Sequence, residues 1–282
     1  MSAPESAGRR GIAGVGRNPL GAGLITAGLF GLTYVAAVHT GVGRELDQSA
    51  LLAKSAVIEV SPIAVEIVDI VPVAAVAIIL GAVTLTRGGW RLGAMVAALV
   101  AGASAGALLL ARTLPQVVEG LPSYPSGHAT LAMAMACALV LVAAPAWRRP
   151  LATVGGGLAI IVGLGLIEIG WHRPAEIAAG YLLAFACFLL VALHRGRSVA
   201  LPDSEADAAP SPPARSVTIV AVIVISLLAA ASIATGLADA LEHDEITDWV
   251  AFAPSEIVLI ALALGLTHWL ANLVEPAARG PR

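Results

Sequence analysis

Residues 92–110 read LGAMVAALVAGASAGALLL, a stretch of apolar and small residues that contains no charged side chain. A helix needs about 20 mostly apolar residues to cross the hydrocarbon core of a bilayer. Apolar residues would cover every face of this helix, whereas a helix on the surface of a soluble protein is apolar on one side only. The stretch therefore predicts a transmembrane helix.

The composition of the whole chain agrees with a membrane location. Of its 282 residues, 58% are hydrophobic, whereas about 45–50% is usual for soluble domains. Only 12% are charged, and the mean hydropathy is +0.88. A disordered chain would need low hydrophobicity and high charge. The net charge of −3, with basic residues that are scattered rather than clustered, argues against nucleic-acid binding.

Seven further runs of this kind predict an all-α, polytopic transmembrane helix bundle. Strands of a β-barrel would alternate polar and apolar residues over about ten positions, and these runs do not. With the quoted stretch, the expected spans are Leu20–Val42, Ile67–Leu85, Leu92–Leu110, Ala129–Ala146, Leu151–Ile169, Ile177–Leu193, Val217–Ala238 and Ile257–Leu273. Between the first two spans, Leu51–Val60 fits a short interfacial helix.

The basic residues predict the orientation of the spans, because cytoplasmic loops carry an excess of Lys and Arg. Twelve of the sixteen basic residues fall on one side if the N-terminus is cytoplasmic and the spans alternate. The other four are Arg44, Lys54, Arg112 and Arg173. We therefore expect a multi-pass protein of the cytoplasmic (plasma) membrane with both termini in the cytoplasm.

Changes in composition divide the chain into four parts. Residues 1–19 are polar and basic, which predicts a cytoplasmic tail, and residues 195–215 are rich in Pro and acidic residues, which predicts a cytoplasmic linker. The linker separates a six-span core at 20–194 from a two-span addition at 216–282.

Several polar residues fall together on the predicted outer side. Pro125-Ser126-Gly127-His128 directly precedes a span, and the unpaired N–H groups at a helix start carry partial positive charge and bind anions such as phosphate. Gly127 allows close approach to the backbone, Ser126 can cap the helix or donate its hydroxyl, and His128 can donate a proton. The alternative is a Ser-Gly helix cap beside an interfacial His.

His172 and Glu176 form a second candidate pair, one helical turn apart if Pro174 lies in the first turn of the sixth span. A carboxylate bound to one ring nitrogen fixes the tautomer of a His and makes the other nitrogen a better base or nucleophile. The alternative is an interfacial ion pair. Glu168, one turn before His172, could pair with Arg112.

The segment PSYPSGHAT at 122–130, followed by GWHRPAEIAAG at 170–180, resembles the type 2 phosphatidic acid phosphatase (PAP2) family. This family includes lipid phosphate phosphatases and vanadium haloperoxidases. The resemblance covers the six-span core, and the two last spans lie outside it. It implies a phosphatase that uses neither a metal nor another cofactor and that forms a covalent phosphohistidine.

The resemblance also implies roles for single residues. His172 would attack phosphorus, Glu176 would orient it in the place of the family's Asp, and His128 would protonate the leaving alcohol. Ser126 and the Gly127 amide would hold phosphate oxygens.

The cations of the family's motifs are only partly present. Arg112 takes the place of a Lys, whereas Gln116 and Leu166 stand where the family has Arg. Arg173 could supply one charge to the phosphate. Tyr124, together with Trp171, fits the interfacial aromatic belt.

These features predict a membrane enzyme that removes phosphate from a lipid phosphate or pyrophosphate at the outer face. The missing cations leave a second interpretation open, a PAP2-type protein with little or no activity that binds lipid phosphates or acts as a scaffold. A transporter would place polar residues near the middle of the membrane, and here they gather at one face. A vanadium haloperoxidase would need more cations than the motifs supply.

Overall fold

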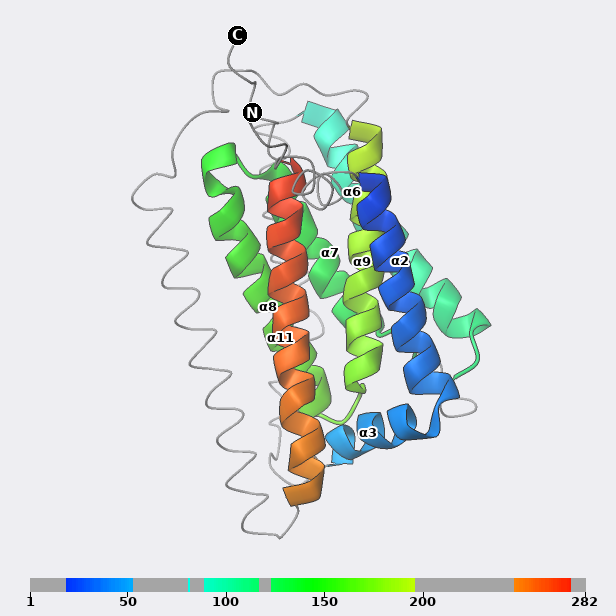
Figure 1. Ribbon diagram of the computed structural model, residues 1–282. Coiled ribbons are helices and arrows are strands. Elements are labelled where there is room, and N and C mark those ends of the chain that lie inside the picture. Colours follow the sequence, from blue (N-terminus) through cyan, green and yellow to red (C-terminus); the bar gives the residue numbers. More distant parts are fainter. Residues whose placement is uncertain (1–18, 53–80, 82–88, 117–122, 196–245, 275–282) are drawn as a thin grey trace, which may run out of the picture.

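The computed structural model describes residues 19–52, 81, 89–116, 123–195 and 246–274, and all regular elements there are helical (Figure 1). They are α2 (Pro19–Tyr34) with its π-helical continuation η1 (Val35–His39), α3 (Gly41–Leu52), α6 (Gly89–Thr113), α7 (Gly127–Val142), the 3-10 turn η2 (Pro145–Trp147), α8 (Arg148–Glu168), α9 (Pro174–Arg195) and α11 (Ile246–Val274). This confirms the predicted all-α bundle.

Five of the described helical segments are long and apolar enough to cross a membrane, so the protein is a membrane protein. They are Pro19–His39, Trp90–Thr113, Pro145–Ile167, Pro174–Leu193 and Phe252–Val274, and each overlaps a predicted span. The fourth predicted span corresponds to α7, a shorter apolar helix. The predicted spans Ile67–Leu85 and Val217–Ala238 lie outside the described residues, apart from Gly81.

Helix α7 forms the centre of the bundle, because most of its residues are buried between α6, α8 and α9. Small residues allow this close packing. A side chain at Gly155 of α8 would lie 3.0 Å from the backbone of Ala136 in α7, and one at Gly156 would lie 2.8 Å from the hydroxyl of Thr267 in α11. These two glycines of α8 therefore serve the close packing of helices.

Helix α11 shares the core with the preceding helices, although it belongs to the predicted C-terminal addition. Its buried residues Leu259, Ala263 and Leu266 join the same apolar cluster as α7, α8 and α9. Arg148 at the start of α8 donates a hydrogen bond to the carbonyl of Val274 at 3.0 Å. The boundaries of the core and the addition remain predictions, but the packing between them is continuous.

Helix α3 lies across the end of the bundle where α8 ends and α9 begins (Figure 1). It differs from the predicted helix at Leu51–Val60, because it begins ten residues earlier, at Gly41. Residues 53–60 of that prediction lie outside the described part of the chain. The extended backbone at Thr40 ends η1, and its hydroxyl accepts a hydrogen bond from the Gly43 N–H at 3.0 Å, which caps the new helix.

Candidate active site

The turn after α8 determines where His172 emerges. Gly170 has a left-handed backbone with a φ of 69°, which glycine adopts without steric cost. Its N–H bonds the carbonyl of Ile167 at 2.9 Å, and the N–H of Trp171 bonds that of Leu166 at 3.0 Å. This is the Schellman pattern of helix ends. The next residue, His172, is thereby held directly beyond the end of α8.

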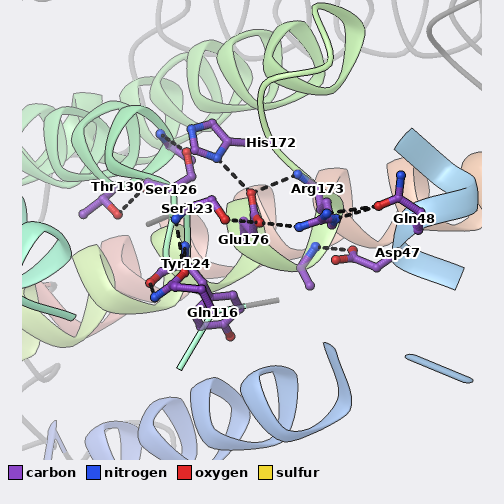
Figure 2. Close-up of polar contacts among 12 residues, drawn as sticks. Asp47, Gln48, Gln116, Ser123, Tyr124, Ser126, Thr130, His172, Arg173 and Glu176 are labelled. Carbon is purple, nitrogen blue, oxygen red and sulfur yellow. Dashed lines mark hydrogen bonds and ion pairs between the residues drawn. The ribbon is translucent and has the colours of Figure 1, made fainter. Parts of the chain in front are cut away.

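His172 and Glu176 meet as predicted. Nδ1 of His172 lies 2.9 Å from Oε2 of Glu176, in the first turn of α9 (Figure 2). The carboxylate is fully buried, whereas the His side chain retains some exposure. Nε2 of His172 has no hydrogen-bond partner among the residues that the structure describes. The pair therefore leaves one ring nitrogen of an oriented imidazole available to a ligand.

Three more donors fix the Glu176 carboxylate (Figure 2). Ser123 donates its hydroxyl to Oε1 at 2.7 Å. Arg173 donates its backbone N–H to Oε2 and its Nη1 to Oε1, each at 3.2 Å. Charge-assisted bonds of this kind are stronger than bonds between neutral groups. The orientation of the carboxylate is thus set from both of its oxygens.

The start of α7 is joined to the start of α9. Ser126 caps α7, because its hydroxyl oxygen accepts from the Ala129 N–H at 3.3 Å, and its own N–H donates to the carbonyl of Glu176 at 2.9 Å. Ser126 is fully buried, whereas Gly127 is exposed. The Gly127 N–H has no hydrogen-bond partner in the described ranges, so it can meet an anion.

His128 lies close to His172 and to the aromatic side chain of Trp171. Its ring centroid is 6.2 Å from that of His172 and 5.8 Å from that of Trp171. Trp171 is 45% exposed and places an apolar ring beside His128. The two His rings therefore lie close enough together for one ligand beside them to contact both.

Gln116 and Tyr124 support the loop before α7. Oε1 of Gln116 accepts from the N–H groups of Ser123 and Tyr124 at 3.1 and 2.9 Å. Its amide nitrogen donates to the carbonyls of Ala111 and Leu114 at 3.0 and 2.8 Å. Tyr124 was expected in the interfacial aromatic belt, but it is fully buried against Phe30 and Tyr34.

The predicted cations Arg112 and Arg173 lie in different surroundings. Arg173 is bound to Glu176 and to Gln48. Arg112 is exposed in the last turn of α6 and makes no hydrogen bond or ion pair with the described residues. Glu168 ends α8, and its side chain lies outside what the structure describes. Leu166, at the place of a family Arg, is fully buried in the apolar cluster.

Two residues of α3 and one of the loop before α7 belong to the site although no motif in the sequence predicts them. Gln48 and Asp47 reach the start of α9, and Ser123 reaches Glu176. Asp47 accepts a hydrogen bond from the Ala175 N–H at 2.9 Å and so caps α9 from another helix. These contacts join residues 53 to 128 positions apart, and no local sequence pattern pairs residues at such separations.

Burial makes the Asp47 carboxyl group a weaker acid than usual. It raises the pKa of this carboxyl from 3.8 to about 7, although the hydrogen bond from Ala175 opposes the effect. Glu176 raises this pKa further, and Arg173 lowers it. Burial likewise raises the pKa of the Tyr124 hydroxyl. Asp47 therefore changes charge near neutral pH, directly behind the His172–Glu176 pair.

The comparison with known families gives one match. Residues 110–199 match the model of the PAP2 superfamily, from the end of α6 through α9 and four residues beyond. No curated protein and no solved structure matches the chain. The matched residues contain both His residues, Glu176 and the capped start of α7, and they confirm the resemblance. Residues 110–199 of the chain are therefore a PAP2-type region.

Proposed function

We propose that the protein is a membrane phosphatase that hydrolyses a lipid phosphate or pyrophosphate through a phosphohistidine intermediate. The observation that carries the proposal is the bond between His172 Nδ1 and Glu176, which leaves Nε2 as the nucleophile. The PAP2 domain around this pair supports a phosphatase. We further propose that the site faces the outside of the cytoplasmic membrane, on the basis of the basic residues in the predicted inner loops.

The proposed reaction has two steps. Nε2 of His172 attacks phosphorus, the bond from phosphorus to the leaving oxygen breaks, and His128 protonates that oxygen. A water molecule then attacks the phosphohistidine, His128 takes a proton from the water, and the N–P bond breaks to release phosphate. Glu176 stabilises the positive charge on His172 during the first step. Phosphoryl transfer depends mainly on positioning and charge stabilisation, and the oriented pair and the Gly127 N–H provide both.

The location of the site favours an amphiphilic substrate. His172 lies between two apolar helices that are long enough to cross a bilayer, and His128 lies at the start of the shorter apolar helix α7. A lipid can keep its tail in the membrane while its headgroup reaches Gly127 and His172. Trp171, which is exposed beside His128, would line the path of the leaving alcohol.

The test is phosphate release by the purified full-length protein in detergent, over a panel of phosphatidate, phosphatidylglycerol phosphate and polyprenyl pyrophosphate. His172→Ala should abolish release, while its thermal unfolding midpoint shows that it remains folded. Acid quenching during turnover should trap phosphate on His172, detected by mass spectrometry. Full activity of the His172→Ala variant would exclude His172 as the nucleophile.

A second candidate function is the binding of lipid phosphates without turnover. It is favoured by the position of Arg173, whose guanidinium is bound to Glu176 and Gln48 rather than open to a ligand. This function predicts saturable binding of a lipid phosphate to liposomes or nanodiscs that contain the protein, with no release of phosphate from any member of the panel.

A further inference from the structure

Two adjacent side chains of α3 bind the start of α9, and neither takes part in the steps proposed above. Oε1 of Gln48 accepts hydrogen bonds from Nε and Nη2 of Arg173 at 3.1 and 3.0 Å. Oδ1 of Asp47 accepts from the Ala175 N–H at 2.9 Å. Figure 2 shows both contacts reaching from α3 to α9. The helix that crosses the bundle is therefore attached to the segment that carries the His172–Glu176 pair.

The bond to Gln48 determines where the guanidinium of Arg173 lies. A guanidinium is planar and presents its N–H groups in a fixed arrangement. One edge, Nε and Nη2, is bound by Gln48, and Nη1 on the other side donates to Oε1 of Glu176 at 3.2 Å. The Arg173 side chain is only 11% exposed. Gln48 thus holds the Arg173 guanidinium against the Glu176 carboxylate.

We infer that Gln48 is a positioning residue, which acts through Arg173 and Glu176 to keep Nδ1 of His172 bonded and Nε2 directed at the substrate. Asp47 adds to this by fixing the backbone of α9 one residue before Glu176. The inference rests on the proposed function for its kinetic readout, whereas the contacts themselves do not depend on turnover. It assigns α3 to the active site, although α3 lies outside the residues that match the PAP2 model.

If Arg173 instead binds the phosphate, the effect of Gln48 on the kinetics should be different. If Arg173 were a phosphate ligand that Gln48 merely withholds, loss of Gln48 would free the cation and lower KM. If Gln48 positions Glu176, its loss lowers kcat and leaves KM nearly unchanged, because the substrate does not touch Arg173. The division of the effect between kcat and KM therefore decides between the two roles.

The variants separate these effects. Gln48→Met keeps the length of the side chain and removes the acceptor, Gln48→Glu keeps an acceptor, and Glu45→Gln changes an exposed residue of the same helix as a control. Loss of a hydrogen bond to a charged group predicts a fall in kcat of roughly tenfold for Gln48→Met. Gln48→Glu should recover most of it, and Glu45→Gln should match the wild type. In an Arg173→Met background, Gln48→Met should add nothing further.

A second measurement needs no turnover. Diethyl pyrocarbonate modifies neutral imidazole, and mass spectrometry of peptides gives its rate at His172. This rate should fall roughly threefold or more in Gln48→Met and stay at the wild-type value in Glu45→Gln. If the wild type releases no phosphate but this pattern holds, the proposed function fails and the positioning role of Gln48 stands.

Three results would overturn the inference. One is an unchanged His172 modification rate in a folded Gln48→Met protein. The second is a fall in KM in place of a fall in kcat. The third is full additivity with Arg173→Met. Should Gln48→Met fail to fold, Gln48→Glu and Arg173→Met provide the same comparison, because one keeps the acceptor and the other removes the donor.

Discussion

At the scale of single residues, the site consists of one buried carboxylate and the groups that fix it. Glu176 accepts from His172, from Ser123 and twice from Arg173. A carboxyl group in this position can accept four hydrogen bonds, whereas an amide offers one acceptor atom only. The orientation of His172 therefore depends on the ionised form of Glu176.

Replacement of this carboxylate by an amide should nearly abolish the reaction. Glu176→Gln places an NH2 group where two donors now point, so it would misorient His172 and remove the charge that stabilises its cationic form. We expect kcat to fall roughly a hundredfold or more, as for other His residues that lose an orienting carboxylate. Ser123→Ala, which removes one donor only, should cost less than tenfold in the same phosphate-release measurement. Equal losses in both variants would contradict this ranking.

The raised pKa of Asp47 predicts how the stability of the folded protein depends on pH. Its pKa is about 7 in the folded protein and 3.8 ordinarily, so the folded state holds the proton more tightly. The stability from this group is full below pH ~4 and is lost as the pH rises towards ~7. Asp47→Asn keeps the acceptor for Ala175 and should remove this loss. Thermal unfolding in detergent between pH 4 and 7 would show a smaller decline in the variant, and an identical decline would contradict the assignment.

At the scale of elements, the apolar spans and the start of α7 could be read from the sequence, whereas α3 could not. Hydrophobic runs specify spans because the membrane imposes one length and one composition on all of them. The cap at Ser126 is local, so the Ser-Gly pattern was sufficient to predict it. Helix α3 is only 12 residues long and polar on much of its surface. Its place is set by contacts with α9 and α11, which no local pattern records.

The end of α8 gives a prediction at this scale. Gly170→Ala places a Cβ on a left-handed residue, which costs about 1–2 kcal/mol. The turn would relax and shift His172, which lies two residues later. We expect a lower unfolding midpoint together with a fall in kcat. Gly127→Ala is the control for a glycine at the same end of the bundle, because its Cβ would meet open space. This control should keep the midpoint of the wild type.

At the scale of the whole molecule, the residues that match the PAP2 model do not form the bundle alone. The composition predicted a two-span addition after 215, but the side chains of α11 fill the same core as α7 and α8. The linker at 195–215 separates the sequence without separating the packing. The composition of a segment indicates whether it can lie outside the membrane. It does not indicate which helix surfaces pack against one another. The packing of the helix surfaces decides which helices fold together as one unit.

The contact between α8 and α11 can be tested directly. A side chain at Gly156 would lie 2.8 Å from the Thr267 hydroxyl and 3.1 Å from Leu264. Gly156→Leu should therefore push α11 away and lower the unfolding midpoint by roughly 5 °C or more. Gly102→Leu on α6 is the matched control, because that position is exposed and faces open space. A similar loss in both variants would indicate a general effect of leucine instead of a packing contact.

The hydrogen bond between the Ser126 N–H and the Glu176 carbonyl joins the start of α7 directly to the start of α9. The Ser126 carbonyl also lies against α9, where a side chain at Gly180 would come within 2.8 Å of it. The start of α7, with the Gly127 N–H, and the start of α9, with Glu176, are therefore held together and should move as one. In the proposed reaction a bulkier substrate would therefore gain no room at phosphorus, and its extra atoms would extend past Trp171. Selectivity among lipids would then depend on how the chemical groups attached to the leaving oxygen fit beside Trp171.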